Sequence, residues 1–270
     1  MTINGSGSSV ASGASGRQRK IKGKTIGEMD SNDLLGLAKA LLEKEADNIE
    51  HLTMPHAVKS LIGWRNHPEA SDSILFSPLA EQIQDWVHEE CLNKRHEVRQ
   101  KAFQSFYLMA CECEKLGNFA SSHAIARALC GKYFEGFELI RGRAAKSAGG
   151  AEKLQKALQH LSEPPDGVLA TIPPIDYRLR RLLPLFDAIR DDVATINWEA
   201  CRLFYQSLVQ VLRQPVLPSP EANVHESYHK FLRARMYEAS LHRSDHQSLS
   251  EHLSANENRE MQDMRNRAGF

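Results

Sequence analysis

Apolar residues recur every three or four positions over most of the chain from Met29 onward, the spacing that gathers them on one face of an α-helix. The clearest example runs from about residue 98 to residue 116, where the apolar side chains form one broad face. Further helices are expected at about 31–42, 83–87, 119–129, 151–162, 177–190, 197–213 and 226–241. Stretches that alternate between polar and apolar residues are essentially absent, so the pattern predicts an all-α fold.

The same pattern divides the chain into three parts. Residues 1–27 are rich in glycine and serine and then basic, a composition typical of a flexible tail. Residues 28–245 carry the helical patterns and predict a single helical domain, because no internal repeat of fixed period indicates a solenoid. Residues 246–270 are polar, and we expect a loose C-terminal tail or a frayed helix there.

Composition and charge exclude several classes of protein. Lys plus Arg and Asp plus Glu both number 34, and this balance argues against a nucleic-acid binder, which normally has a basic excess. No run of about 18 apolar residues occurs, so we expect no integral membrane segment. The five cysteines are an odd number set mostly in helical patterns, as expected for the reduced thiols of a cytosolic protein.

One short motif suggests a metallopeptidase. His225, Glu226 and His229 form an HExxH motif, in which a helix would place two imidazoles on one face for zinc and offer a glutamate as general base. Glu251 is the candidate for a third ligand by spacing alone. The alternative is chance, since the chain has twelve histidines and a charged residue, Lys230, follows the motif. We favour chance and assign no metal site and no cofactor.

A candidate helical hairpin is formed by residues 177–189 and residues 197–212. Its first arm is more apolar than one buried stripe requires. A core helix explains most of these side chains, but Leu183 and Asp187 stand at i and i+4 and could project together into a partner. Pro184 lies inside the arm, where it lacks a backbone donor and clashes with the carbonyl of Arg180, so the arm should bend or restart there.

A series of segments, in order along the chain, resembles the catalytic domain of Ras-type guanine-nucleotide exchange factors. The best segment runs from Glu97 to Ala120, where an arginine, an apolar helix, an Ala-Cys pattern and Leu-x-Asn-Phe fall in step with the family. The other similar segments are residues 29–43, 77–87, 123–129, 172–183, 195–198 and 231–241. The resemblance implies an all-α domain with a protruding helical hairpin.

The resemblance also implies a function. The chain is expected to bind a Ras-superfamily small GTPase and to promote release of its GDP without covalent chemistry and without a cofactor. A monomer is the default expectation. The expected location is the cytoplasm, or the host cytosol if the protein is a secreted bacterial effector.

The site residues are carried over from the family by position. Leu183 would intrude on the magnesium site of the GTPase, and Asp187 would compete for its phosphate-binding groups. Arg99 and Asn118 match positions that face the GTPase in the family, and Leu179 and Arg180 on the hairpin arm are expected to bind it as well. Asn118 is also well placed to cap the helix that follows it.

Two departures from the family pattern leave an alternative open. The acidic run after the first arm is replaced by the segment from Phe186 to Ile189, which keeps only Asp187 as an acid. Pro184 interrupts the arm itself. A catalytically inactive scaffold that binds its partner without releasing nucleotide is therefore the second hypothesis.

Overall fold

The computed structural model describes residues 21, 23–50, 53–66, 77–135, 137, 139–163, 172–191, 195–212 and 224–268. Over these residues the chain is built almost entirely from helices, which confirms the all-α prediction. The tail predicted over residues 1–27 lies mostly outside the described residues. Its end differs from a loose tail, because Ile21 and Ile26 are both buried and the short helix η1 (Ile26–Glu28) lies against the body of the protein.

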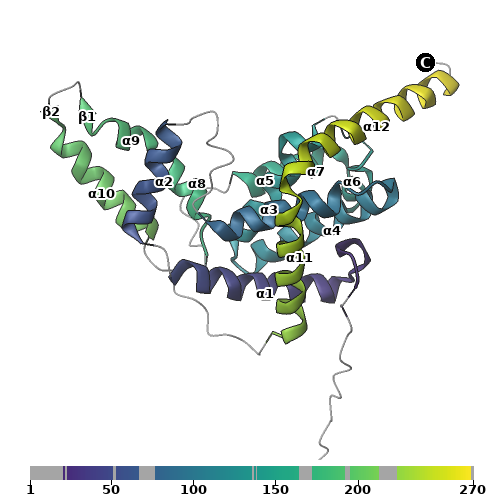
Figure 1. Cartoon of the computed structure of the whole chain (residues 1–270), viewed down its shortest axis with the longest axis horizontal. Coiled ribbons are helices and arrows are strands. Elements are labelled where there is room, and N and C mark those ends of the chain that lie inside the picture. The colour runs from purple at the N-terminus through teal and green to yellow at the C-terminus, as the bar shows by residue number, and fades with distance from the viewer. Residues whose placement is uncertain are drawn as a thin grey trace, which may run out of the picture.

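The helices form two groups, which we call the body and the hairpin lobe (Figure 1). The body contains α1 (Ser31–Glu50), α3 (Pro78–Cys91), α4 (His96–Lys115), α5 (Phe119–Cys130), η3 (Lys132–Phe134), α6 (Gly142–Ala148), α7 (Ala151–Ser162), α11 (Glu226–Leu241), η4 (Arg243–Asp245) and α12 (His246–Ala268). The hairpin lobe contains α2 (Met54–Asn66), α8 (Ile175–Arg180), α9 (Leu183–Asp187), β1 (Arg190–Asp191), β2 (Thr195–Ile196) and α10 (Trp198–Leu212).

The core of the body lies between α3, α4 and α5, with α1 and α11 packed around them. Aromatic side chains fill its centre: Trp86 packs edge-on against Phe106 with ring centroids 4.8 Å apart, and Phe103 packs edge-on against Phe134. These rings are fully buried and account for much of the apolar area that drives folding. The apolar stripe read from the sequence over residues 98–116 is the stripe that α4 buries here.

The start of α5 fixes the root of the hairpin lobe. Asn118 caps α5, because its side-chain oxygen accepts a hydrogen bond from the backbone N–H of Ser121, as the sequence predicted. Backbone hydrogen bonds also join this turn to Ile172: its N–H donates to Gly117 and its carbonyl accepts from Phe119 and Ala120. The segment that enters α8 is therefore anchored on the body.

The hairpin lobe has an apolar core of its own. Trp64 and Leu61 of α2 face Leu179 of α8 and both Phe204 and Leu208 of α10, and all five are buried. Helix α10 buries residues spaced four apart on one face, which is the pattern of an amphipathic surface helix. Because this cluster is separate from the core of the body, the lobe is held to the body mainly near its root.

The first arm of the hairpin restarts at Pro184, as predicted. Helix α8 ends at Arg180, a turn follows, and α9 begins at Leu183 with the proline in its first turn. A proline in that position removes a donor that has no helical partner in any case. The arm is thus two short helices rather than one long one.

The C-terminal segment differs from the loose tail that its composition predicts. Residues 246–268 form α12, and its first half buries side chains at 3–4 spacing, namely His246, Ser250, Leu253 and Glu257. Glu257 accepts a hydrogen bond from the backbone N–H of Leu139 at 2.7 Å and pairs with Arg99 of α4 at 3.4 Å. The start of α12 is therefore part of the body, while its far end projects away from it (Figure 1).

Two buried histidines make stability depend on pH. Burial lowers the pKa of His88 to about 3, with His246 acting in the same direction, and lowers the pKa of His123 to about 4, with Arg127 adding to the effect. As the pH falls, a histidine whose pKa is lowered by folding takes up its proton at a higher pH in the unfolded chain than in the folded protein. Protonation therefore favours the unfolded chain. Stability contributed by the neutral ring is thus complete above a pH of about 6.5 and is lost as the pH falls toward the folded pKa.

Acidification from about pH 7.5 to about pH 5.5 should therefore lower the unfolding free energy by about 1.4 kcal/mol for each of these two histidines. Urea denaturation at both pH values measures the change. His123→Gln should remove about half of this pH dependence, whereas the exposed His252→Gln should leave it unchanged. An equal pH dependence in wild type and His123→Gln would contradict the assignment.

Candidate functional site

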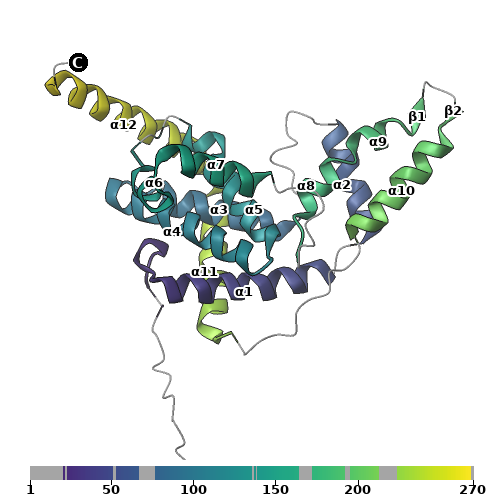
Figure 2. The same cartoon turned by 180° about the vertical axis from the view of Figure 1, so that it is seen from behind.

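The hairpin lobe stands out from the body at one end of the molecule (Figures 1 and 2). Helices α8 and α9 run outward and α10 returns, and α2 packs beside them. At the outer tip β1 and β2 form a two-residue antiparallel pair, in which the backbone of Arg190 is in register with Ile196 and that of Asp191 with Thr195. This projecting position leaves the lobe accessible to another protein.

The outer face of α10 exposes large apolar side chains. Trp198 has 75% of its surface exposed and Tyr205 has 61%, and Val209 is exposed as well. At 100° per residue these three positions lie within about 20° of one direction, which is about 120° around the helix from the middle of the face that α10 buries. Ile196 adds a further exposed apolar residue at the tip. We call Ile196, Trp198, Tyr205 and Val209 the tip surface.

A tryptophan with this much of its surface exposed is unusual, because the ring places a large apolar area in water. Burying the ring against a partner would remove that area from water. Aromatic residues are also the side chains that most often carry the energy of protein–protein interfaces. The tip surface therefore has the character of a contact surface for a partner protein. In the sequence alone these side chains were not selected as site residues.

Leu183 and Asp187 are the first and last residues of α9. Leu183 is partly buried and packs against the core of the lobe, whereas Asp187 is more than half exposed. Oδ1 of Asp187 lies 3.0 Å from Nε of Arg65 on α2. Ion pairs this exposed contribute about 0–1 kcal/mol to stability, so the carboxylate can change partner at little cost.

The other two predicted hairpin residues are parts of the lobe's packing. Leu179 is fully buried between α8 and its neighbours. The guanidinium carbon of Arg180 lies 4.5 Å from the centre of the Trp64 ring, a cation–π contact that joins α8 to α2. These positions shape the arm that carries Leu183 and Asp187.

Arg99 lies in the body away from the hairpin lobe, whereas Asn118 lies at the root of the lobe beside Ile172. Arg99 is buried in the body, where Nη1 donates to the carbonyls of Asn93 and Lys94 and Nη2 pairs with Glu257. Asn118 is fully buried as the cap of α5. In this conformation both side chains are buried, so each has a structural role in the body, and their contact with a GTPase stays a prediction.

The HExxH residues do not form a metal-binding arrangement. His225 precedes α11 as its N-cap, and its Nδ1 accepts from the backbone N–H of Ser227. His229 lies within the helix, with Nε2 2.8 Å from Oε2 of Glu43 on α1. Among the described residues, these two histidines do not belong to any cluster close enough to hold a metal ion. The cap position of His225 is the reason, since the zinc geometry requires both histidines on the helix.

Comparison with known families agrees with the fold. The family model of the RasGEF domain matches residues 36–202, which is 167 of the 270 residues. No curated protein matches the chain. The protein thus belongs to a class of helical domains that act on small GTPases. Specifically, the chain belongs to the RasGEF domain family, whose members act as guanine-nucleotide exchange factors and not as covalent catalysts.

The matched region contains part of the tip surface. It extends from the second turn of α1 to the start of α10 and includes α8, α9, the tip strands and Trp198, whereas Tyr205 and Val209 lie beyond it. Helices α11 and α12 lie beyond it. The resemblance of residues 231–241 to the family covers α11, and α12 lies outside that segment as well. In the described part of the chain, no helix has both the length and the apolar character to span a bilayer.

Proposed function

We propose that this protein binds a Ras-superfamily small GTPase through the hairpin lobe and promotes release of GDP from it. The observation that carries the proposal is the tip surface: a RasGEF domain presents Trp198, Tyr205 and Val209 on the outer face of its projecting hairpin. A surface of this kind loses unfavourable contact with water when a partner covers it. The partner that covers this surface would be a folded GTPase.

Exchange follows from linked binding equilibria. A GTPase holds its nucleotide mainly through phosphate contacts and Mg²⁺. An exchange factor that binds the nucleotide-free form more tightly weakens nucleotide binding by the same factor, because the coupling is reciprocal. No covalent bond is made or broken. The residues that promote GDP release are therefore those whose contacts with the GTPase exist only in the nucleotide-free complex.

Asp187 and Leu183 are the proposed residues that make such contacts. Asp187 is exposed, and its present partner Arg65 is equally accessible, so it can turn toward basic phosphate-binding groups of the GTPase. Leu183 heads the same short helix and would enter the magnesium site. Its partial burial in the lobe means that α9 has to shift for the whole side chain to reach a partner.

Asp187→Ala should reduce the catalysed rate of GDP release by at least tenfold, because it removes the competing acid, while the melting temperature stays nearly unchanged. Release of fluorescent GDP is measured over a panel of Ras, Rap, Ral, Rho, Rab and Arf-type GTPases. Glu238→Ala is the matched control, since Glu238 is a similarly exposed acid on α11 of the body whose partner is Arg235. Full activity of Asp187→Ala would refute the placement of the acid.

The inactive scaffold is the second candidate, and the restart at Pro184 is the observation that favours it. A broken arm with Leu183 packed into the lobe could retain binding but lose the ability to open the nucleotide site. In that case the protein forms a complex with a GTPase, seen by calorimetry, without accelerating release from any member of the panel. Acceleration of release from one member, lost in Asp187→Ala, would reject the scaffold.

A further inference from the structure

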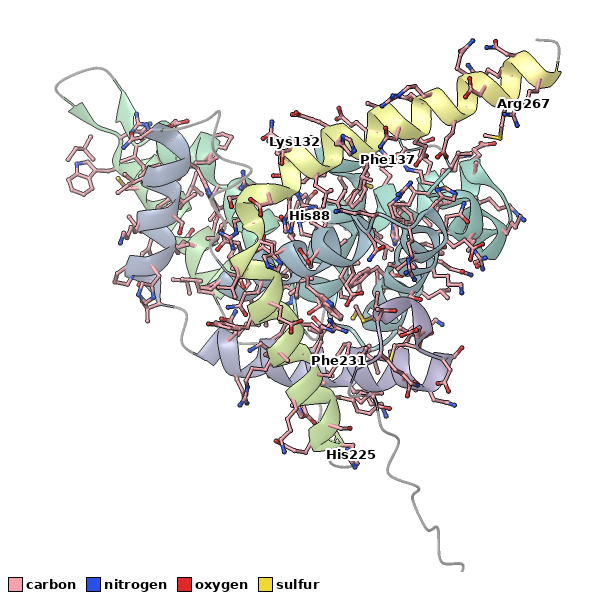
Figure 3. The ribbon with its side chains drawn as sticks, turned by 45° about the vertical axis from the view of Figure 1, so that its right-hand side comes forward. His88, Lys132, Phe137, His225, Phe231 and Arg267 are labelled. Carbon is pink, nitrogen blue, oxygen red and sulfur yellow. The ribbon has the colours of Figure 1, made fainter. Side chains whose placement is uncertain are left out.

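Three side chains of types that bind metal ions lie close together in the body, outside the hairpin lobe. Asp85 and His88 project from α3 toward His246 at the start of α12, and one potential ligand atom from each lies within 4.8 Å of the other two. All three residues are buried. We call this set the α3–α12 cluster, and Figure 3 marks His88 beside the corner where α11 passes into α12.

His88 has a ring nitrogen without a hydrogen-bond partner. Nε2 of His88 is buried and makes no hydrogen bond in the described structure. The other side of the ring is engaged, since the Ala128 carbonyl acts as a hydrogen-bond partner of this imidazole. An unpaired polar atom in a buried position is costly, and a metal ion is one group that would satisfy it.

From this geometry we propose that the α3–α12 cluster binds a divalent transition-metal ion of the zinc type, through Nε2 of His88, a ring nitrogen of His246 and a carboxylate oxygen of Asp85. Two imidazoles and one carboxylate are a ligand set that suits zinc, whereas magnesium and calcium prefer oxygen ligands alone. Ligand atoms around tetrahedral zinc lie roughly 3.4 Å apart, so closing the cluster takes side-chain shifts of about 1.4 Å at most.

The surroundings resemble the outer shell of a metal site. A carbonyl partner on one nitrogen of an imidazole fixes the tautomer and leaves the other nitrogen free to coordinate, which is the role of Ala128 toward His88. Oε2 of Glu89 lies 3.2 Å from Nε2 of His246, so a carboxylate is present to orient that ring. Burial lowers the pKa of His88 to about 3, which keeps its ring neutral and able to coordinate at physiological pH.

Charge around the cluster also favours a cation. Glu81 and Asp85 share a single guanidinium, that of Arg243, and the third carboxylate, Glu89, contacts only the rings of His242 and His246 among the contacts described. Arg243 makes two of its contacts to Oδ2 of Asp85 and one to Oδ1, so Oδ1 is the oxygen with more capacity left for a metal. The bound ion would join α3 to the start of α12 and stabilise the corner from which α12 projects.

Zinc titration of the chelator-treated full-length protein tests the proposal. We expect one equivalent of zinc to bind with a dissociation constant of about 1 μM or below and to raise the melting temperature by several degrees at saturation. His88→Gln and His246→Gln should each weaken binding at least tenfold. His225→Gln/His229→Gln is the control, because it removes the other paired histidines and should leave affinity and stoichiometry unchanged.

Cobalt substitution gives a second measurement that needs no variant. Co²⁺ bound to the wild-type protein should show the visible absorption of a four-coordinate site with nitrogen and oxygen ligands, and zinc should displace it. Absence of stoichiometric zinc binding, or binding lost in His225→Gln/His229→Gln but kept in His246→Gln, would overturn the proposal. Circular dichroism identifies any variant that fails to fold, in which case the cobalt spectrum of the wild type decides.

Discussion

Trp198→Ala should weaken the complex with the nucleotide-free GTPase by about 30-fold or more, which corresponds to the roughly 2 kcal/mol typical of an aromatic hot spot. The reason is the position of this side chain: it is the most exposed of the large apolar residues on the tip surface, and a partner would bury it. Calorimetric titration of the GTPase stripped of nucleotide measures the affinity. Because catalysed release requires this complex, its rate at limiting concentrations should fall in proportion.

The folded protein itself should tolerate that change. Trp198 makes few contacts within its own chain, so its removal should alter the unfolding free energy by no more than about 0.5 kcal/mol. Tyr237→Ala is the matched control, since Tyr237 is a similarly exposed aromatic residue on α11 in the body, away from the hairpin lobe. Equal affinity of Trp198→Ala and wild type for every GTPase in the panel would remove the tip surface from the proposed function.

Glu257→Ala should lower the unfolding free energy by about 3–5 kcal/mol, as is usual when one partner of a buried ion pair is removed. The guanidinium of Arg99 would remain buried without its carboxylate, and the backbone N–H of Leu139 would lose its acceptor. Chemical denaturation followed by circular dichroism measures the loss. A decrease of less than about 1 kcal/mol would show that the pair contributes no more than an exposed one.

Two controls separate this effect from general damage to α12. Glu152→Ala breaks an exposed pair with Lys156 on α7 and should change stability by less than about 0.5 kcal/mol. Ending the chain after residue 258 removes a part of α12 that is almost entirely exposed and should be nearly neutral, whereas ending it after residue 245 should destabilise the body. Equal stability of both truncated proteins would contradict the packing of α12.

Local features of the fold could be predicted because they depend on neighbouring residues. The helix after Asn118 has its cap beside it in the sequence, and the restart at Pro184 follows from the missing donor and the ring of that residue. Helix α12 could not be predicted in this way. Its buried stripe, at residues 246, 250, 253 and 257, has helical spacing but consists mainly of polar residues, which gain stability only from partners distant in the chain.

The hairpin that carries the candidate site was predicted from the sequence, but its exposed apolar surface was not. The sequence placed a hairpin over residues 177–212 and singled out Leu183 and Asp187, and those roles remain predictions. Trp198 was within the resemblance to the family, yet its apolar character by itself did not distinguish it from a core residue. A helical-wheel comparison with Ala200, Phe204 and Leu208 is the signal that could have identified its exposed face.

The sequence by itself determined the all-α class and many of the helices, because periodicity and caps act over a few residues. Its ordered series of motifs also indicated the family. Tertiary structure decided which side chains are accessible. It buried Arg99 against Glu257, capped α11 with His225, exposed Trp198 and brought His88 to His246. The physical reason is that burial depends on contacts between segments far apart in the chain, and a single sequence does not specify those contacts.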